Sequence, residues 1–236
     1  IEQVRINKVN YEPMIITVGH RKPIGICGSG LIDTLSEMFL TGIVNEKGKI
    51  NTELPTDRVR AVEGGAEYVL VRAEDSATRR DIVITEVDID NLMRAKAAVY
   101  AGIEILLSSV DMDVSMIDEL LIAGAFGRYL EVDKAVTIGL LPDIGYDKMK
   151  FVGNGSLLGA HLAALSKDML NKANDIAHQM TYLELSMNPA FMEHYLSALF
   201  FPHTNLEAFP SVLEKLEIYR NEQRWAGEAA TGGEVG

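Results

Sequence analysis

Three glycine-rich turns are the residues of this sequence whose type and spacing could hold a ligand. They are Gly28-Ser29-Gly30, Gly124-Ala125-Phe126-Gly127 and Gly153-Asn154-Gly155-Ser156. Each turn joins an extended segment to a helical pattern, and such junctions offer backbone N–H groups that a phosphate or a nucleoside can approach without meeting a Cβ. Tight turns of this kind also use glycine for steric reasons alone, so a single turn is weak support for a binding site.

The second and third turns strengthen each other because each closes a short apolar segment. Residues 119–123 and 149–152 have the continuous hydrophobic character of buried parallel strands, and helical patterns follow the glycines. The carboxyl ends of neighbouring parallel strands line one crevice. The two turns therefore predict a shared groove for a ligand.

Other reactive groups are few. Cys27 precedes the first turn at an expected helix start, where the helix dipole would lower the pKa of a thiol. A small buried side chain in a crowded turn is the interpretation that we favour. A single cysteine excludes an internal disulfide, a Cys-rich zinc site and an iron–sulfur cluster held by this chain alone, and it favours a reducing, cytoplasmic setting. The five histidines lack metal-ligand spacing.

The elements that must position the turns follow from the hydrophobic pattern, which is mostly that of strands up to residue 84 and of alternating strands and helices afterwards. Strands are expected over residues 4–6, 14–18, 59–62, 68–71, 82–84, 119–123, 149–152 and 181–185. Helices are expected between Gly30 and Gly42, over 88–109, 157–165 and 167–178, and from Pro189 to before Pro202. The helix over 88–109 has a predicted start cap at Asp88 or Asp90 and a predicted buried face of Leu92, Ala95, Val99, Ile103 and Leu106.

Charge and composition exclude several classes of protein. The 236 residues contain 22 Lys and Arg against 34 Asp and Glu, a net charge of −12, which disfavours nucleic acid as a partner. The sequence contains neither an uninterrupted apolar run of about 18 residues nor the pattern of a signal peptide, so nothing in it predicts a membrane segment. The sequence opens without Met in what reads as a strand, so we expect a piece of a longer protein: an ordered domain over 1–215 and a disordered tail over 216–236.

Five short motifs, in order, resemble the C-terminal part of the reductive activators of corrinoid proteins. The resemblance covers roughly residues 1–214. The motifs are Ile24–Asp33, Leu121–Leu130, Ile138–Pro142, Phe151–Ala160, and Phe201–Thr204 together with Phe209–Val212.

The resemblance implies an α/β fold of mixed α+β character, built from RNase H-like lobes of the superfamily that unites actin, sugar kinases, heat-shock chaperones and acetate kinase. In that superfamily ATP lies in a cleft between two lobes. In the activators, the resemblance implies, ATP with Mg²⁺ drives an electron from an iron–sulfur cluster on an N-terminal ferredoxin domain onto the cobalt of an inactivated corrinoid protein. That protein is then the implied partner, and relatives suggest a homodimer.

Carried over by position, Gly124, Ala125, Phe126 and Gly127 match the turn that holds adenosine. Gly153, Asn154, Gly155 and Ser156, with Gly159-Ala160, match the small-residue helix on which the lobes hinge. Lys96, on the helix before the adenosine turn, is a further expected nucleotide ligand, whereas Gly28, Ser29 and Gly30 are expected to be a structural turn.

The phosphate-binding hairpins and the cluster cysteines of the family are not in this sequence. This chain alone is therefore expected to bind no metal, to hydrolyse no ATP and to transfer no electron. Two alternatives stay open. The chain could be a docking or dimerisation module whose glycine turns serve packing only, or a relative of sugar or acyl kinases that transfers a phosphoryl group to an unknown acceptor.

Overall fold

The first part of the chain is a small antiparallel hairpin packed on a helix. The computed structural model describes residues 1–124 and 127–231, with the side chains of residues 128 and 222–231 outside that description. Strands β1 (Gln3–Ile6) and β2 (Pro13–Ile16) pair antiparallel, and helix α1 (Gly28–Leu40) packs along β1. Both strands and the helix confirm the sequence prediction. Gly42 follows the end of α1 with φ +76°, a conformation that suits glycine.

A three-stranded antiparallel sheet comes next, made of β3 (Val59–Val62), β4 (Gly65–Val71) and β5 (Ile82–Thr85). The predicted hairpin about Gly64-Gly65 is confirmed, and Gly64 adopts φ +90° at its tip. The residues of β4 from Tyr68 to Val71 are buried, so this central strand joins the hydrophobic core.

The long helix α2 (Glu86–Ser108) starts about one turn before the predicted cap, and the face that it buries differs from the predicted one. Its N-cap is Thr85, which forms a reciprocal capping box with Asp88. The predicted face is wrong, because Val99 and Leu106 are 47% and 55% exposed. The buried positions of α2 are instead Ile89, Met93, Lys96, Ala97, Tyr100, Ala101, Gly102 and Ile105. Residues near the C-terminus cover that face: Phe209 stacks on Tyr100 with ring centroids 5.6 Å apart.

Two parallel strands form the third sheet. β6 (Leu120–Ala123) and β7 (Met149–Gly153) are neighbours, as predicted, and the chain between them contains the short helix α3 (Val132–Thr137). α3 packs against α1, which joins this sheet to the body of the molecule. Short 3-10 turns connect the elements at Val18–His20, Val114–Met116, Gly127–Tyr129, Tyr146–Lys148, Leu185–Met187 and Leu206–Ala208.

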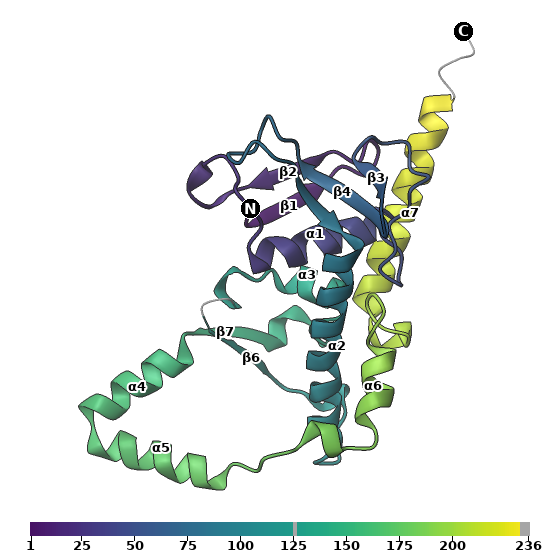
Figure 1. Ribbon diagram of the computed structural model, residues 1–236. Helices are drawn as coiled ribbons and strands as arrows, with labels where there is room; N and C mark the ends of the chain where they lie inside the picture. The colour runs from purple at the N-terminus through teal and green to yellow at the C-terminus, as the bar shows by residue number, and fades with distance from the viewer. Residues whose placement is uncertain (125–126, 232–236) are drawn as a thin grey trace.

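Helices α4 (Gly155–Leu165) and α5 (Lys167–Gln179) pack on each other and extend away from the body as an arm (Figure 1). Neither helix contains a buried residue. The strand expected over residues 181–185 is wrong, since the chain there is irregular and then turns at Leu185–Met187. This stretch has no neighbouring strand in the described part of the chain to supply ladder hydrogen bonds.

The C-terminal segment returns along α2. Helix α6 (Phe191–Ser197) packs on α2, and Asn188 accepts a hydrogen bond from the N–H of Ala190 just before it. Helix α7 (Pro210–Thr231) follows and includes most of the tail over 216–236 that was expected to be disordered, and residues 232–236 lie outside the described residues. α7 is anchored by its buried first turn at Val212 and by contact with α1.

Candidate functional site

The second and third glycine turns lie side by side. β6 and β7 are parallel, so their carboxyl ends meet at one edge, and the N–H of Gly124 donates to the carbonyl oxygen of Gly153 at 2.7 Å. The same edge faces the side of the molecule on which α1 begins (Figure 1). The predicted juxtaposition of the two turns is confirmed. Ala125 and Phe126 of the expected adenosine turn lie outside the described residues.

Conformation explains two of these glycines, and packing explains a third. Gly124 and Gly153 adopt φ values of +103° and +69°, and a Cβ built on either would meet no atom within 4 Å. A Cβ on Gly127 would lie 2.7 Å from Cγ2 of Ile122, so that glycine is required by a neighbouring side chain. The backbone at Gly124 and Gly153 is therefore open to a ligand, whereas Gly127 serves the packing of its own turn.

The rest of the third turn starts helix α4. Asn154 is the N-cap, and its Oδ1 accepts a hydrogen bond from the N–H of Leu157 at 3.0 Å. Gly155 and Ser156 form the first helical turn, and Ser156 is exposed. Helix α4 thus begins directly at the edge that carries Gly124 and Gly153.

The first turn starts helix α1, with Gly28, Ser29 and Gly30 as its first residues. A Cβ on Gly30 would lie 2.4 Å from the carbonyl oxygen of Ile1, which agrees with the expected structural role. Cys27 is exposed, so the interpretation of a buried side chain is wrong. Partial burial raises the pKa of its thiol, but hydrogen bonds with Ser29 and with backbone groups outweigh burial and leave the pKa below its usual value.

Lys96 does not lie in a nucleotide site. Its side chain is fully buried, and Nζ donates hydrogen bonds to the carbonyl oxygens of Phe200 and, at 2.6 Å, Pro202. Burial lowers the pKa of this amine to about 7. The expectation of a nucleotide ligand is corrected: Lys96 ties α2 to the C-terminal segment, and its donors are used there.

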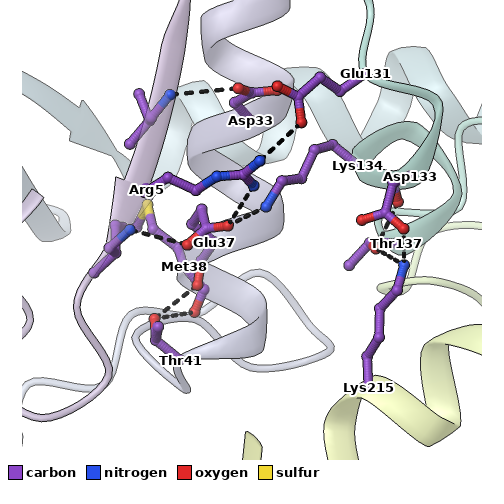
Figure 2. A network of polar contacts seen from close by, with 12 residues as sticks. Arg5, Asp33, Glu37, Met38, Thr41, Glu131, Asp133, Lys134, Thr137 and Lys215 are labelled. Carbon is purple, nitrogen blue, oxygen red and sulfur yellow. Dashed lines mark hydrogen bonds and ion pairs between the residues drawn. The ribbon is translucent and has the colours of Figure 1, made fainter. Parts of the chain in front are cut away.

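A network of charged side chains lies around the segment that follows the Gly124–Gly127 turn (Figure 2). Lys134 of α3 forms a buried ion pair with Glu37 of α1. Glu37 also accepts hydrogen bonds from the N–H of Ile6 at 2.9 Å and from Arg5 at 3.3 Å. Arg5 reaches Glu131, just before α3, at 3.1 Å. Three segments distant in sequence, namely β1, α1 and the residues at the start of α3, thus meet at one cluster.

Asp33, one helical turn before Glu37, completes the cluster by accepting a hydrogen bond from the N–H of Val4 at 3.3 Å. Burial and the nearby Glu131 carboxylate raise the pKa of Asp33 to about 6. No motif in the sequence predicted this network. The spacing of two carboxylates four residues apart on an otherwise apolar helix was the available signal, because such residues face the same side.

A separate cavity of about 660 Å³ lies at the other end of the parallel strands. Its lining includes Ser115 and Lys148, which precede β6 and β7. His194 and Glu104 also line it and pair at 2.8 Å. This cavity is remote from the glycine turns, which form an open edge.

The described residues offer no candidate cluster of metal ligands and no candidate helix able to cross a bilayer. No group of three or more His, Cys, Asp or Glu side chains in that part of the chain is arranged to hold a metal ion. None of the helices described there combines the length and hydrophobicity that a bilayer crossing requires.

The sequence of residues 1–213 matches the family described as the C-terminal domain of RACo, the ASKHA domain. The chain belongs to this family. The ASKHA fold accounts for the mixture of helices and strands and for the paired turns at one sheet edge, and it agrees with the fold expected from the sequence motifs.

Relatives of this ASKHA domain include proteins named for corrinoid activation. The corrinoid activation enzyme RamQ of Eubacterium limosum is 34% identical over 81% of this chain, and the [Co(II) methylated amine-specific corrinoid protein] reductase of Methanosarcina barkeri is 23% identical over 89%. A solved structure of a reductive activator for a corrinoid, iron-sulfur protein matches 89% of the chain with a TM-score of 0.83 and 48% identity. The chain spans about a third of the length of these relatives, between 34% and 38%.

Proposed function

We propose that this chain forms the adenosine side of the ATP cleft in an ATP-dependent reductive activator that returns inactivated corrinoid proteins to the reduced cobalt state. The observation that carries the proposal is the hydrogen-bonded pair of glycine turns at Gly124 and Gly153, both open above the backbone. A corrinoid protein is the proposed partner, as the names of the relatives suggest. A homodimer is the proposed assembly.

The residues present fit one side of a nucleotide. Backbone at Gly124 and Gly153 can approach a ribose or a base closely because no Cβ intervenes. The first turn of α4 supplies backbone N–H groups beside them, at the positive end of a helix dipole. In this proposal the chain binds and orients ATP, and ATP hydrolysis supplies the free energy for electron transfer.

The remaining cofactors belong to other segments of the proposed activator. A chain with one cysteine cannot supply the thiolates of an iron–sulfur cluster, and Cys27 lies apart from any group of potential metal ligands in the described residues. We therefore place the cluster and the Mg²⁺ ligands outside this chain.

The arm suits a contact with the second lobe of the cleft. Leu157, Leu158, Leu162 and Leu165 of α4 are 66%, 56%, 43% and 73% exposed, and apolar side chains exposed together often mark a contact with another protein segment. Gly159 and Ala160 leave room for close approach of another element. We propose that α4 packs on the other lobe and acts as the hinge segment.

The test compares two glycine substitutions in the full natural chain that contains this segment. Gly124→Ala places a Cβ in the proposed nucleotide space, and Gly64→Ala is its matched control, with φ +90° and equally open surroundings at a distant hairpin. We expect ATP affinity, measured by calorimetry, to fall at least about tenfold for Gly124→Ala alone. ATP-dependent conversion of Co(II) to Co(I) in a corrinoid protein, followed by absorbance, should fall with it.

Equal affinities for the two variants, or the absence of ATP-dependent cobalt reduction by the unaltered protein, would contradict the proposal. A second comparison uses residues 1–236 alone. We expect this segment to turn over no ATP, since no cluster of metal ligands is present among its described residues and the transfer of a phosphoryl group requires a placed metal ion.

A further inference from the structure

We propose that Glu37 and Lys134 are positioning residues for the nucleotide, because their buried ion pair fixes the segment that leaves the adenosine turn against helix α1. This inference rests on the proposed function. It assigns a role in nucleotide affinity to side chains that lie outside the glycine turns.

The adenosine turn has two arms that are held in different ways. The arm that enters the turn is β6, which the parallel ladder with β7 holds in place. The arm that leaves it runs through Gly127–Tyr129 and the buried Leu130 to α3, and no strand pairs with it in the described part of the chain. The turn Gly127–Tyr129 packs on β6 and β7, and beyond it side chains hold the second arm against α1.

The ion pair between Lys134 and Glu37 is placed to do this. The two side chains are only 3% and 2% exposed, so water screens their attraction little. The neighbouring pair of Arg5 with Glu131 is 54% and 31% exposed and contributes less. The buried pair consequently sets where α3, and with it the departing arm, lies on α1.

Glu37 is itself held in register with strand β1. Asp33 and Glu37 are one turn apart on α1, and they accept hydrogen bonds from the N–H groups of Val4 and Ile6, two residues apart on β1. Four helical residues rise about 6 Å and two strand residues about 6.6 Å, so the two spacings match. Lys134 therefore binds an acceptor whose position the backbone of β1 already fixes.

Helix α3 is also tied to helix α7, through residues other than Lys134. Asp133 accepts a hydrogen bond from Lys215 of α7, and Lys215 also contacts Thr137 at 3.3 Å. Helix α7 lies on the opposite side of the molecule from the carboxyl ends of β6 and β7 (Figure 1). Removing this tether loosens α3 from α7 but leaves the contact with α1 and β1 in place.

The decisive variant combines Glu37→Gln with Lys134→Met in the full natural chain. Glutamine keeps an oxygen for the N–H of Ile6, and the pair of changes leaves neither a buried carboxylate nor a buried ammonium unpaired. The protein should therefore remain folded, as the midpoint of thermal unfolding will show. Lys215→Met is the matched control at α3, and Lys134→Arg is the conservative variant that keeps the charge.

The measurement is the dissociation constant of ATP by calorimetry, with the unfolding midpoint recorded for every variant. We expect the double variant to bind ATP about five to tenfold more weakly, Lys134→Arg to recover most of the affinity, and Lys215→Met to bind as the unaltered protein does.

The inference is overturned if the folded double variant binds ATP with unaltered affinity. It is also overturned if Lys215→Met weakens binding as much as the double variant does. Failure of the unaltered protein to bind ATP is a different result, since it removes the proposed function on which the inference rests.

Discussion

Helices α1 and α4 are both apolar, yet they differ completely in burial. Every residue of α1 from Ile32 to Leu40 is buried, including Asp33 and Glu37, whereas α4 has no buried residue. α1 lies between β1, α3 and α7, but α4 packs on α5 alone among its larger contacts. Burial in this chain therefore follows from the neighbours that the chain supplies, and hydrophobicity by itself does not determine it.

The contrast between α1 and α4 reflects the organisation of the domain into a closed body and an exposed arm. Elements around α1 form a complete core in which even charged groups find partners, while the arm presents leucines without cover. A surface of that kind suits the contact with another lobe that we propose for α4. Substitutions in α1 should consequently change the stability of this chain by itself, whereas substitutions in α4 should matter mainly where another protein segment contacts the arm.

The largest effect is expected from breaking the buried ion pair. Lys134→Met leaves the carboxylate of Glu37 buried with only the partly exposed Arg5 as a cationic partner, and such a loss costs about 3–5 kcal/mol. Urea unfolding of the purified chain, followed by circular dichroism, measures it. A loss of stability below about 1 kcal/mol would show that water reaches the ion pair, and it would contradict the burial of α1 described above.

A core leucine in α1 should be the next most sensitive position. Leu35 is fully buried, so Leu35→Ala is expected to lower the free energy of unfolding by about 2–5 kcal/mol through lost contacts and a cavity. Leu165→Ala in α4 is its counterpart, because Leu165 is 73% exposed, and the expected change is within about 0.5 kcal/mol. Similar losses for the two variants would remove the contrast between the helices.

Asp33→Asn should stabilise the chain in a manner that depends on pH. The folded pKa of about 6 exceeds the usual 3.8, so the folded state binds more protons than the unfolded state between these values and stability declines as the pH rises through them. The variant, which cannot ionise there, should be more stable above pH 6, by up to about 3 kcal/mol, and its advantage should vanish near pH 4. Thermal unfolding across pH 4–8 measures the difference.

The smallest change concerns the arm. Gly159 lies within α4, and a Cβ there would meet no atom within 4 Å. Gly159→Ala should therefore raise the stability of α4 by about 0.5–1 kcal/mol through helix propensity. Amide hydrogen exchange of α4 in residues 1–236 reports it. In the full natural chain the same change should lose this benefit if another element packs closely on Gly159.

Most of the local structure could be predicted because its causes are local. The β-like runs of residues 4–6 and 14–18, the glycine turns and the apolar runs of β6 and β7 are short-range signals, and each element they predicted is present. The juxtaposition of Gly124 and Gly153 also followed, since parallel strands place their carboxyl ends at one edge.

The incorrect predictions concern features that depend on contacts between segments distant in sequence. The sequence of α2 contains two adjacent apolar stripes, and only the return of Phe209 and of the carbonyl groups near Pro202 determines that Tyr100 and Lys96 are inside. The same return explains why a lysine predicted to bind a nucleotide is a structural tie. The pairing of Glu37 with Lys134 could not be foreseen, since 97 residues separate the two.

The tie between Arg5 and Glu131 has a consequence for synthesis of the protein. The two residues are 126 positions apart, so β1 leaves the ribosome long before its partner exists. At about 5–20 residues per second, that interval is roughly 6–25 s. The contact of Lys8 with the ring of Tyr219 in α7 forms later still, because Tyr219 is synthesised after Glu131. The nascent β1 hairpin therefore spends seconds without the charged partners that later cover it.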